Sequence, residues 1–234
     1  VFIAALGPEI QYYTSLVRSL DSSLGNMLER MALSIAELKF EVTQDVKGYL
    51  YPEQYQIISS LLEGYKNSKN PLKPELSHYE QITQAGASYR DNSSLDLTGF
   101  YKTHVSDYCF YDKDQNEYYI IELKIGGDLD NKKARSEKEA IFEQYAILKN
   151  ILDEDAKVTC YFATAYNRFG EGMPWQQGRV RQFFCEDELL IGKDFWDFVC
   201  GSSEGYAVVI DEYKKSASYI LDALNDIKYT YLGN

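Results

Sequence analysis

Apolar and polar positions are most regularly ordered between Ser106 and Gly127. Two segments rich in Tyr, Phe and Ile flank a polar, turn-prone run. This pattern is typical of two antiparallel strands joined by a short loop. Centring the turn in that run pairs Cys109 with Ile120 and places Asp107 directly opposite Glu122.

The second of these segments has the pattern of a central strand. Tyr119, Ile121 and Leu123 alternate on one face, and Ile120 makes the opposite face apolar as well. A strand with two apolar faces is covered on both sides. Charged residues within such a strand usually have a nearby partner or a functional role.

Spacings of three and four between apolar residues predict helices elsewhere, and a β-rich run predicts one more strand. Helices are expected at Ser22–Phe40, from a cap at Asp130 or Asn131 to Leu152, and near the end of Tyr206–Leu232, and the strand at Lys157–Tyr166. These elements predict an α/β fold with a mixed central sheet flanked by helices. The chain has 234 residues, 45% of them hydrophobic, and no proline-rich or low-complexity linker. We therefore expect a single domain over residues 1–234, with helical elaborations at both ends.

Asp107, Glu122 and Lys124 are the candidate catalytic residues. Side chains alternate along a strand, so Glu122 and Lys124 share one face, with Asp107 across from Glu122. Opposed Cβ atoms lie ~5 Å apart, where two ionised carboxylates repel unless a positive charge lies with them. Mg²⁺ accepts such oxygen ligands, and the Leu123 carbonyl is a third candidate ligand. Lys124 would then orient the attacking water or stabilise negative charge during phosphodiester hydrolysis.

A simpler alternative is the solvated face of an ordinary hairpin with a cross-strand ion pair. An E-x-K triplet alone favours this alternative, because such triplets are common. The position on a central strand favours a functional site instead.

The order of these residues resembles the PD-(D/E)xK nuclease superfamily. An Asp on one strand is followed, after a turn, by E-L-K on the next, so Asp107, Glu122 and Lys124 occupy the three motif positions. Ser106 stands where the name of the motif has proline. The resemblance implies a restriction-endonuclease-like core with the metal site at one edge of the sheet, and metal-dependent cleavage of DNA.

The first predicted helix adds to this resemblance. Gly25 is followed four residues later by Glu29 and Arg30. This arrangement resembles the opening helix of several such nucleases, which implies that Glu29 reaches toward the metal site. The alternative is a solvated Glu29, with Gly25 marking the start of the helix.

Within the superfamily, the segments Glu122–Leu148 and Phe183–Phe198 resemble the TdeIII-like type II restriction endonucleases. This resemblance implies a Mg²⁺-dependent homodimer that cuts double-stranded DNA at a short palindrome of the GGNCC type. The alternatives are a junction resolvase or repair nuclease of the same superfamily, and a non-catalytic DNA-binding protein of the same fold.

The formal net charge of −12 requires a local basic cluster for DNA binding, because phosphate binding depends on Lys and Arg. The candidates are Lys132, Lys133 and Arg135 after the motif, and Arg168, Gln176, Gln177, Arg179 and Arg181 in a glycine-containing loop. Arginine can bind guanine through two hydrogen bonds, and glutamine can bind adenine. A second polar stretch, residues 84–94 with Asp91 and Asn92, is expected either to enter a groove of the DNA or to cross the surface of the protein. For each of these residues the alternative is an ordinary surface position.

The remaining composition indicates a soluble cytoplasmic protein. Four cysteines without C-x-x-C spacing argue against a zinc site, and Cys109 and Cys160 are expected to be small buried hydrophobes. His104 is expected to be a structural histidine, with the rim of the active site as the alternative. The first six residues are too short to span a membrane, and the absence of an initial methionine suggests a shortened chain. The C-terminal helix is expected to pack on the domain and to contribute to a dimer surface.

Overall fold

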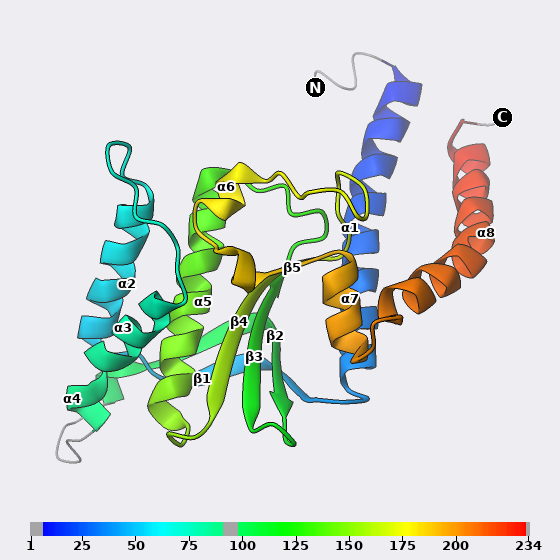
Figure 1. Cartoon of the computed structure of the whole chain (residues 1–234). Helices are drawn as coiled ribbons and strands as arrows, with labels where there is room; N and C mark the ends of the chain where they lie inside the picture. Colours follow the sequence, from blue (N-terminus) through cyan, green and yellow to red (C-terminus); the bar gives the residue numbers. More distant parts are fainter. Residues whose placement is uncertain (1–6, 91–97, 233–234) are drawn as a thin grey trace.

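The computed structural model describes residues 7–90 and 98–232 of the chain. Its centre is a five-stranded sheet in the order β1-β2-β3-β4-β5 (Figure 1). The strands are β1 (Glu41–Tyr49), β2 (Tyr101–Asp112), β3 (Glu117–Leu123), β4 (Lys157–Thr164) and β5 (Leu189–Ile191). The first three pair antiparallel, and the last three pair parallel. The sheet is therefore mixed, as predicted, whereas the expectations for residues 1–6, Asp91 and Asn92 lie outside the described residues.

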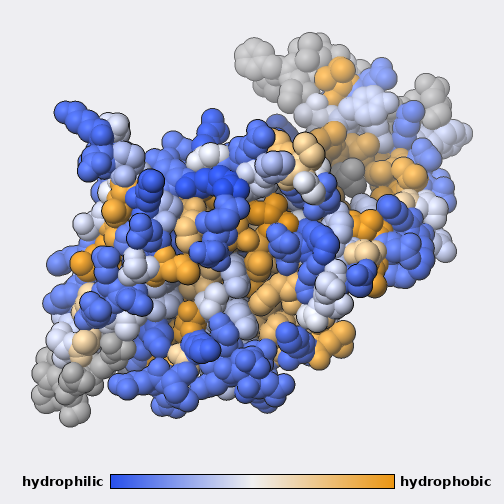
Figure 2. Space-filling model, in the orientation of Figure 1, coloured by the Kyte–Doolittle hydropathy of each residue, from blue (hydrophilic) through white to orange (hydrophobic). Residues whose placement is uncertain are grey.

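Helices cover both faces of this sheet (Figure 1). They are α1 (Pro8–Ala36), α2 (Pro52–Tyr65), α3 (Ser77–Ala85), α4 (Ala87–Arg90), α5 (Asn131–Ile151), α6 (Gly178–Arg181), α7 (Lys193–Cys200) and α8 (Gly205–Leu232), with short 3₁₀ turns η2 (Thr98–Phe100) and η3 (Glu186–Glu188). On one face, α2, α3 and α5 bury a core that includes Ile120 and Phe162. On the other face, α1 and α7 bury a core that includes Phe110 and Ile121. Figure 2 shows further hydrophobic residues at the surface over α1 and α8.

The predicted hairpin is confirmed in its register. Cys109 pairs with Ile120, and Tyr108 pairs with Ile121. Asp107 and Glu122 are the next residues along the two strands. β3 is the third of the five strands, so its prediction as a central strand is also confirmed. The apolar residues on both of its faces reflect the two separate cores.

The helix after the hairpin is confirmed with its cap. The Asp130 side chain accepts a hydrogen bond from the Lys133 backbone N–H at 2.8 Å. An aspartate at this position satisfies a backbone donor that the first helical turn leaves unpaired. Asp130 therefore fixes where α5 begins, just beyond the end of β3.

Three boundaries differ from the prediction. α1 begins at Pro8 rather than Ser22 and ends at Ala36, before Phe40. Proline at the first helical positions favours this early start, because its ring presets a helical φ. Gly25 consequently lies inside the helix, where an added Cβ would contact Ile125 at 3.5 Å. β4 ends at Thr164 rather than Tyr166.

The predicted burial of two cysteines is confirmed. All four cysteines are free, and Cys109 and Cys160 are buried. His104 Nε2 lies 2.7 Å from a Glu143 carboxylate oxygen, and its structural role stays a prediction. Among the helices of residues 7–90 and 98–232, none is long and apolar enough to cross a membrane.

Candidate active site

Asp107 owes its position to an irregularity between β1 and β2. Thr43 pairs with Cys109 and Asp45 with Val105, so β2 carries extra residues between these two pairs. The Gln44 side-chain amide donates to the Asp107 carbonyl at 3.3 Å in this interval. Bulges of this kind redirect a side chain and are frequent beside active sites. The Asp107 carboxylate accepts a hydrogen bond from the Leu123 backbone N–H at 2.8 Å.

Lys124 follows the last residue of β3 and lies among several carboxylates. Its Nζ is 3.2 Å from Asp107 Oδ2, 3.6 Å from Glu122 Oε2 and 3.3 Å from Glu137 Oε2. Burial alone would lower the pKa of Lys124, but the attraction of these three carboxylates raises it above its usual range. The ammonium is therefore held in its charged form.

Glu122 is the most buried of these carboxylates, with 5% of its surface exposed. Burial and the neighbouring charge of Asp107 raise its pKa to about 8, against the opposing effects of Lys124 and Gln144. The Gln144 side-chain amide on α5 donates to Glu122 Oε1 at 2.9 Å. A carboxyl group in such a setting carries a proton unless more positive charge is supplied.

Glu29 approaches the same place from α1. Burial and the charge of Asp107 raise its pKa, and Lys124 opposes the rise. The Tyr108 hydroxyl donates to the Glu29 backbone carbonyl at 2.8 Å, which ties this turn of α1 to β2. The structure thus brings Glu29, Asp107, Glu122 and Lys124 together.

The site lies where the central strand β3 ends, at the edge of the sheet that the strand ends form. β3 has neighbours on both sides, and the carboxylates gather where it ends. The carboxyl ends of strands leave open space, because the chain turns away there into loops and helices.

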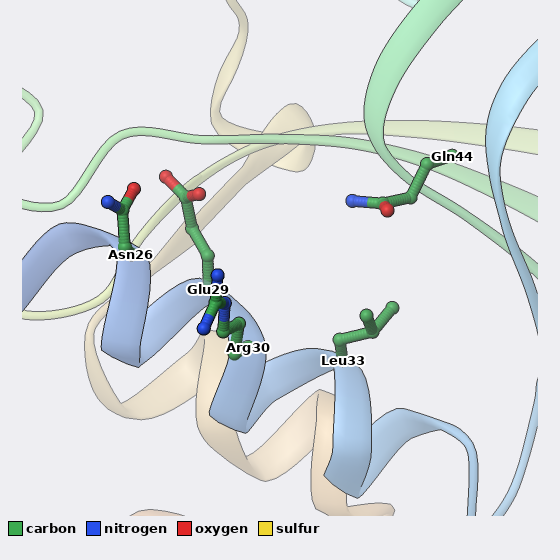
Figure 3. A pocket seen from close by; sticks show the side chains of 5 residues that line it. All are labelled: Asn26, Glu29, Arg30, Leu33 and Gln44. Atoms are coloured by element: carbon green, nitrogen blue, oxygen red, sulfur yellow. The ribbon is translucent and has the colours of Figure 1, made fainter.

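Two hollows flank this group of charged residues. One, of about 380 Å³, is lined by Asn26, Glu29, Arg30, Leu33 and Gln44. In Figure 3, Glu29 rises from α1 and Gln44 points in from the opposite side. The other, of about 500 Å³, is lined by Lys124, Ile125, Gly126, Asp128, Leu129, Tyr166 and Arg168. The group is therefore open to a ligand that extends in two directions.

Glu137 and Gln144 are contacts that the sequence interpretation did not include. They are seven residues apart on α5, which places them two turns apart on one face of the helix. The same face contacts β3, so both side chains reach the site. Their spacing within the predicted helix was the available signal.

The residues present suit a divalent cation. No group of three or more His, Cys, Asp or Glu side chains in residues 7–90 and 98–232 is arranged to hold a metal ion. A cation would therefore depend on Asp107, Glu122 and the Leu123 carbonyl, with water or phosphate, a pattern typical of Mg²⁺. Two observations favour a further positive charge: the raised pKa of Glu122, and the buried Gln144 Oε1, which has no hydrogen-bond partner among the described residues.

The candidate DNA-binding residues differ in their surroundings. Lys132, Lys133, Gln176 and Arg179 are exposed. Arg135 forms ion pairs with Glu63 and Glu139, Arg168 with Asp128, and Arg181 with Glu186, while Gln177 donates to Asp128. The contribution of each to DNA binding stays a prediction. Arg30, at the first hollow, forms no ion pair with another described residue and was not among the candidates.

A mixed sheet flanked by helices, with paired carboxylates and a lysine at the end of its central strand, is consistent with the restriction-endonuclease-like fold. The chain belongs to the family of the type II restriction endonuclease HinfI, whose family model matches residues 1–217. Membership implies a DNA endonuclease, and therefore a DNA-binding hydrolase of a restriction system. No curated protein and no solved structure matches the chain. The more particular resemblances to the PD-(D/E)xK superfamily and the TdeIII-like group stay predictions.

Proposed function

We propose that this chain cleaves double-stranded DNA in a Mg²⁺-dependent manner at a short palindromic site, as a PD-(D/E)xK nuclease acting as a homodimer. The observation that supports this proposal best is the convergence of Asp107, Glu122 and Glu137 on the Lys124 ammonium, each within 3.6 Å. A single ammonium cannot neutralise three carboxylates. The surplus negative charge favours a divalent cation.

Asp107, Glu122 and the Leu123 carbonyl would hold this cation. The Leu123 N–H points at Asp107, and the N–H and C=O of one strand residue point to the same side, so the carbonyl also faces this group. When bound, Mg²⁺ would polarise a phosphoryl oxygen and lower the pKa of a bound water. Glu29 adds a carboxylate from α1, within electrostatic reach of Asp107.

Lys124 has the position to act on the reacting phosphate. Its charged ammonium lies beside the carboxylates and lines the larger hollow. An ammonium there stabilises the negative charge that grows on the phosphate as a water oxygen forms a bond to phosphorus and the P–O bond of the chain breaks. The departing oxygen takes up a proton, which leaves a hydroxyl end and a phosphate end.

The DNA strand would extend over both hollows. Arg30 lies on one side of the site, and Lys132, Lys133 and Arg168 lie toward the other. Local cations of this kind offset the overall acidity of the chain, because DNA affinity depends on charge near the phosphates.

Digestion of supercoiled plasmid with Mg²⁺, followed by sequencing of the ends, tests the proposal. We expect discrete fragments with one repeated short palindrome at their ends, and none when EDTA replaces Mg²⁺. Asp107→Ala should abolish cleavage and leave DNA binding largely intact, whereas Asp45→Ala, an exposed aspartate on β1, should cleave normally. An active Asp107→Ala protein would remove Asp107 from the site. Selective cutting of branched or damaged DNA would instead support a resolvase or repair nuclease, and the sequenced ends also test a GGNCC-like target.

A further inference from the structure

The loop that joins α2 to α3 carries a run of positive charge. Between Glu63 and Glu75 the sequence has three lysines, Lys66, Lys69 and Lys73, and no acidic residue. All three lysines are exposed, and among the described residues only Lys66 has an ionic partner, Glu63 at 3.9 Å. The whole chain, by contrast, has 36 acidic and 24 basic residues. A local cluster of positive charge in an acidic chain indicates a site for an anionic partner.

Hydrogen bonds within the loop hold it in a defined turn. The Asn67 side-chain oxygen accepts from the backbone N–H groups of Lys69 and Asn70, at 3.0 and 3.1 Å. The Leu72 backbone N–H donates to the Gly64 carbonyl at the end of α2, at 3.0 Å. A loop that is ordered before binding loses less conformational entropy when it contacts a partner. The lysines are therefore presented to a partner on a preformed turn.

The loop lies across α5 from the candidate active site. Glu137 of α5 contacts the Lys124 ammonium at 3.3 Å, and Arg135 contacts Glu63 in the last turn of α2 at 2.9 Å. Residues two apart on a helix point to nearly opposite sides. The end of α2, where the loop begins, is thus separated from the site by the width of α5, ~10–12 Å.

Two other basic segments adjoin the loop. Lys132 and Lys133 occupy the first turn of α5, and Arg179 belongs to α6. The Gln182 side chain, directly after α6, donates to the Tyr65 carbonyl at the end of α2, at 3.1 Å. Figure 1 shows the loop, the start of α5 and α6 at the same end of the molecule. The lysines of the loop therefore extend the row of cations that begins beside the active site.

We propose that the loop from Lys66 to Lys73 binds phosphates of the DNA duplex outside the cleaved site. This inference rests on the proposed function, because the duplex is the substrate named there. Contacts to phosphates position a duplex without reading its sequence, and lysine supplies them as a point charge. The width of α5 corresponds to about three base pairs at the rise of DNA, so these contacts fall at or beyond the end of a short half-site. Tight binding would then require duplex on the flanks of the palindrome.

A membrane surface fits the loop less well. Anionic lipids are bound by clusters of about four to eight Lys and Arg beside an apolar anchor. The loop has three lysines and one large apolar residue, Leu72, whose side chain lies against Gly64. It has the charges for phosphate binding without the apolar residues that enter lipid.

Fluorescence anisotropy without Mg²⁺ tests the proposal on a fluorescein-labelled duplex of ~30 base pairs, long enough for nearly three turns. Lys69→Ala combined with Lys73→Ala should lower the slope of log affinity against log salt by about 1.8 per bound chain, since each lost phosphate contact lowers it by about 0.9. Lys157→Ala combined with Lys214→Ala is the matched control, because it removes equal charge from exposed positions on β4 and α8. The control should retain the natural slope.

Equal slopes for the natural chain and the loop variant overturn this inference and leave the proposed function standing. A natural chain that binds no duplex would contradict both. Flank length gives a second measure, on duplexes that carry the site identified by plasmid digestion. Trimming the flanks should raise the KM of the natural chain several-fold at constant kcat, whereas the loop variant should have the raised KM on long and trimmed duplexes alike. A loop variant with the natural KM on the long duplex would also overturn the inference.

Discussion

Lys124 holds its ammonium within 3.6 Å of carboxylates from three different segments of the chain. Asp107 comes from the bulge in β2, Glu122 from β3 and Glu137 from α5. The lysine therefore has two effects, since it relieves repulsion among the acids and presents positive charge to a substrate. The two effects can be separated because removal of the lysine leaves the acids in place.

We expect Lys124→Ala to lower kcat by about 10²- to 10³-fold, the usual cost of removing one group that stabilises transition-state charge. The Mg²⁺ concentration for half-maximal rate should change much less, because the oxygen ligands remain. Metal titration of the cleavage rate measures both quantities. Lys157→Ala, an exposed lysine at the start of β4, should leave both unchanged. A parallel loss of metal affinity and rate would show that Lys124 acts mainly by organising the carboxylates.

Apart from Glu29 of α1, the site residues that the sequence identified lie within or directly after the hairpin. Asp107, Glu122 and Lys124 follow from strand alternation and one turn, because strand pairing is local in sequence. The spacing of Glu137 and Gln144 places them on one face of α5, but which face packs against the sheet depends on tertiary contacts that no local pattern determines. The bulge at Ser106–Tyr108 was also beyond prediction, because it arises from pairing with β1, far away in the sequence.

At the scale of elements, α1 has a different role at each end. Its C-terminal half packs Ala32 and Ala36 on the sheet and carries Glu29 to the site, whereas its N-terminal half has exposed apolar residues such as Val17. Helical spacing predicted the half that packs on the sheet. The start at Pro8 was missed, although the helical spacing of apolar residues continues through the N-terminal half.

Arg30 belongs to the same turn of α1 as Glu29 and lines the first hollow. If it contacts a DNA phosphate, Arg30→Ala should weaken binding about equally for all sequences. The slope of log affinity against log salt should fall by about 0.9, the value for one lost phosphate contact. We suggest measuring this slope in the Asp107→Ala background, so that the DNA stays intact. Lys39→Ala, an exposed lysine beyond the end of α1, serves as the control, and equal slopes for both proteins would remove Arg30 from the DNA path.

At the scale of the whole molecule, a second charged group is fully enclosed by the core. Lys138 of α5 and Glu188 of η3 form an ion pair, with 1% and 0% of their surfaces exposed. The Tyr79 hydroxyl of α3 donates to Glu188 at 2.6 Å, and the lysine also lies over the rings of Tyr79 and Phe142. This network connects α3, α5 and η3 within the core on the α5 side of the sheet. It is therefore a contribution to folding that is separate from catalysis.

Glu188→Ala should reduce the free energy of unfolding by about 3–5 kcal/mol, because it leaves a buried ammonium without its counter-charge. Glu186→Ala removes a surface carboxylate that pairs with Arg181, and it should cost less than about 1 kcal/mol. Urea unfolding followed by circular dichroism measures both changes. Combining Glu188→Leu with Lys138→Met should restore much of the loss, because an apolar pair of similar size needs no counter-charge. If Glu188→Ala lowers the free energy of unfolding no more than Glu186→Ala does, water reaches the Lys138–Glu188 pair. The core around η3 would then be more open than the burial of the pair indicates.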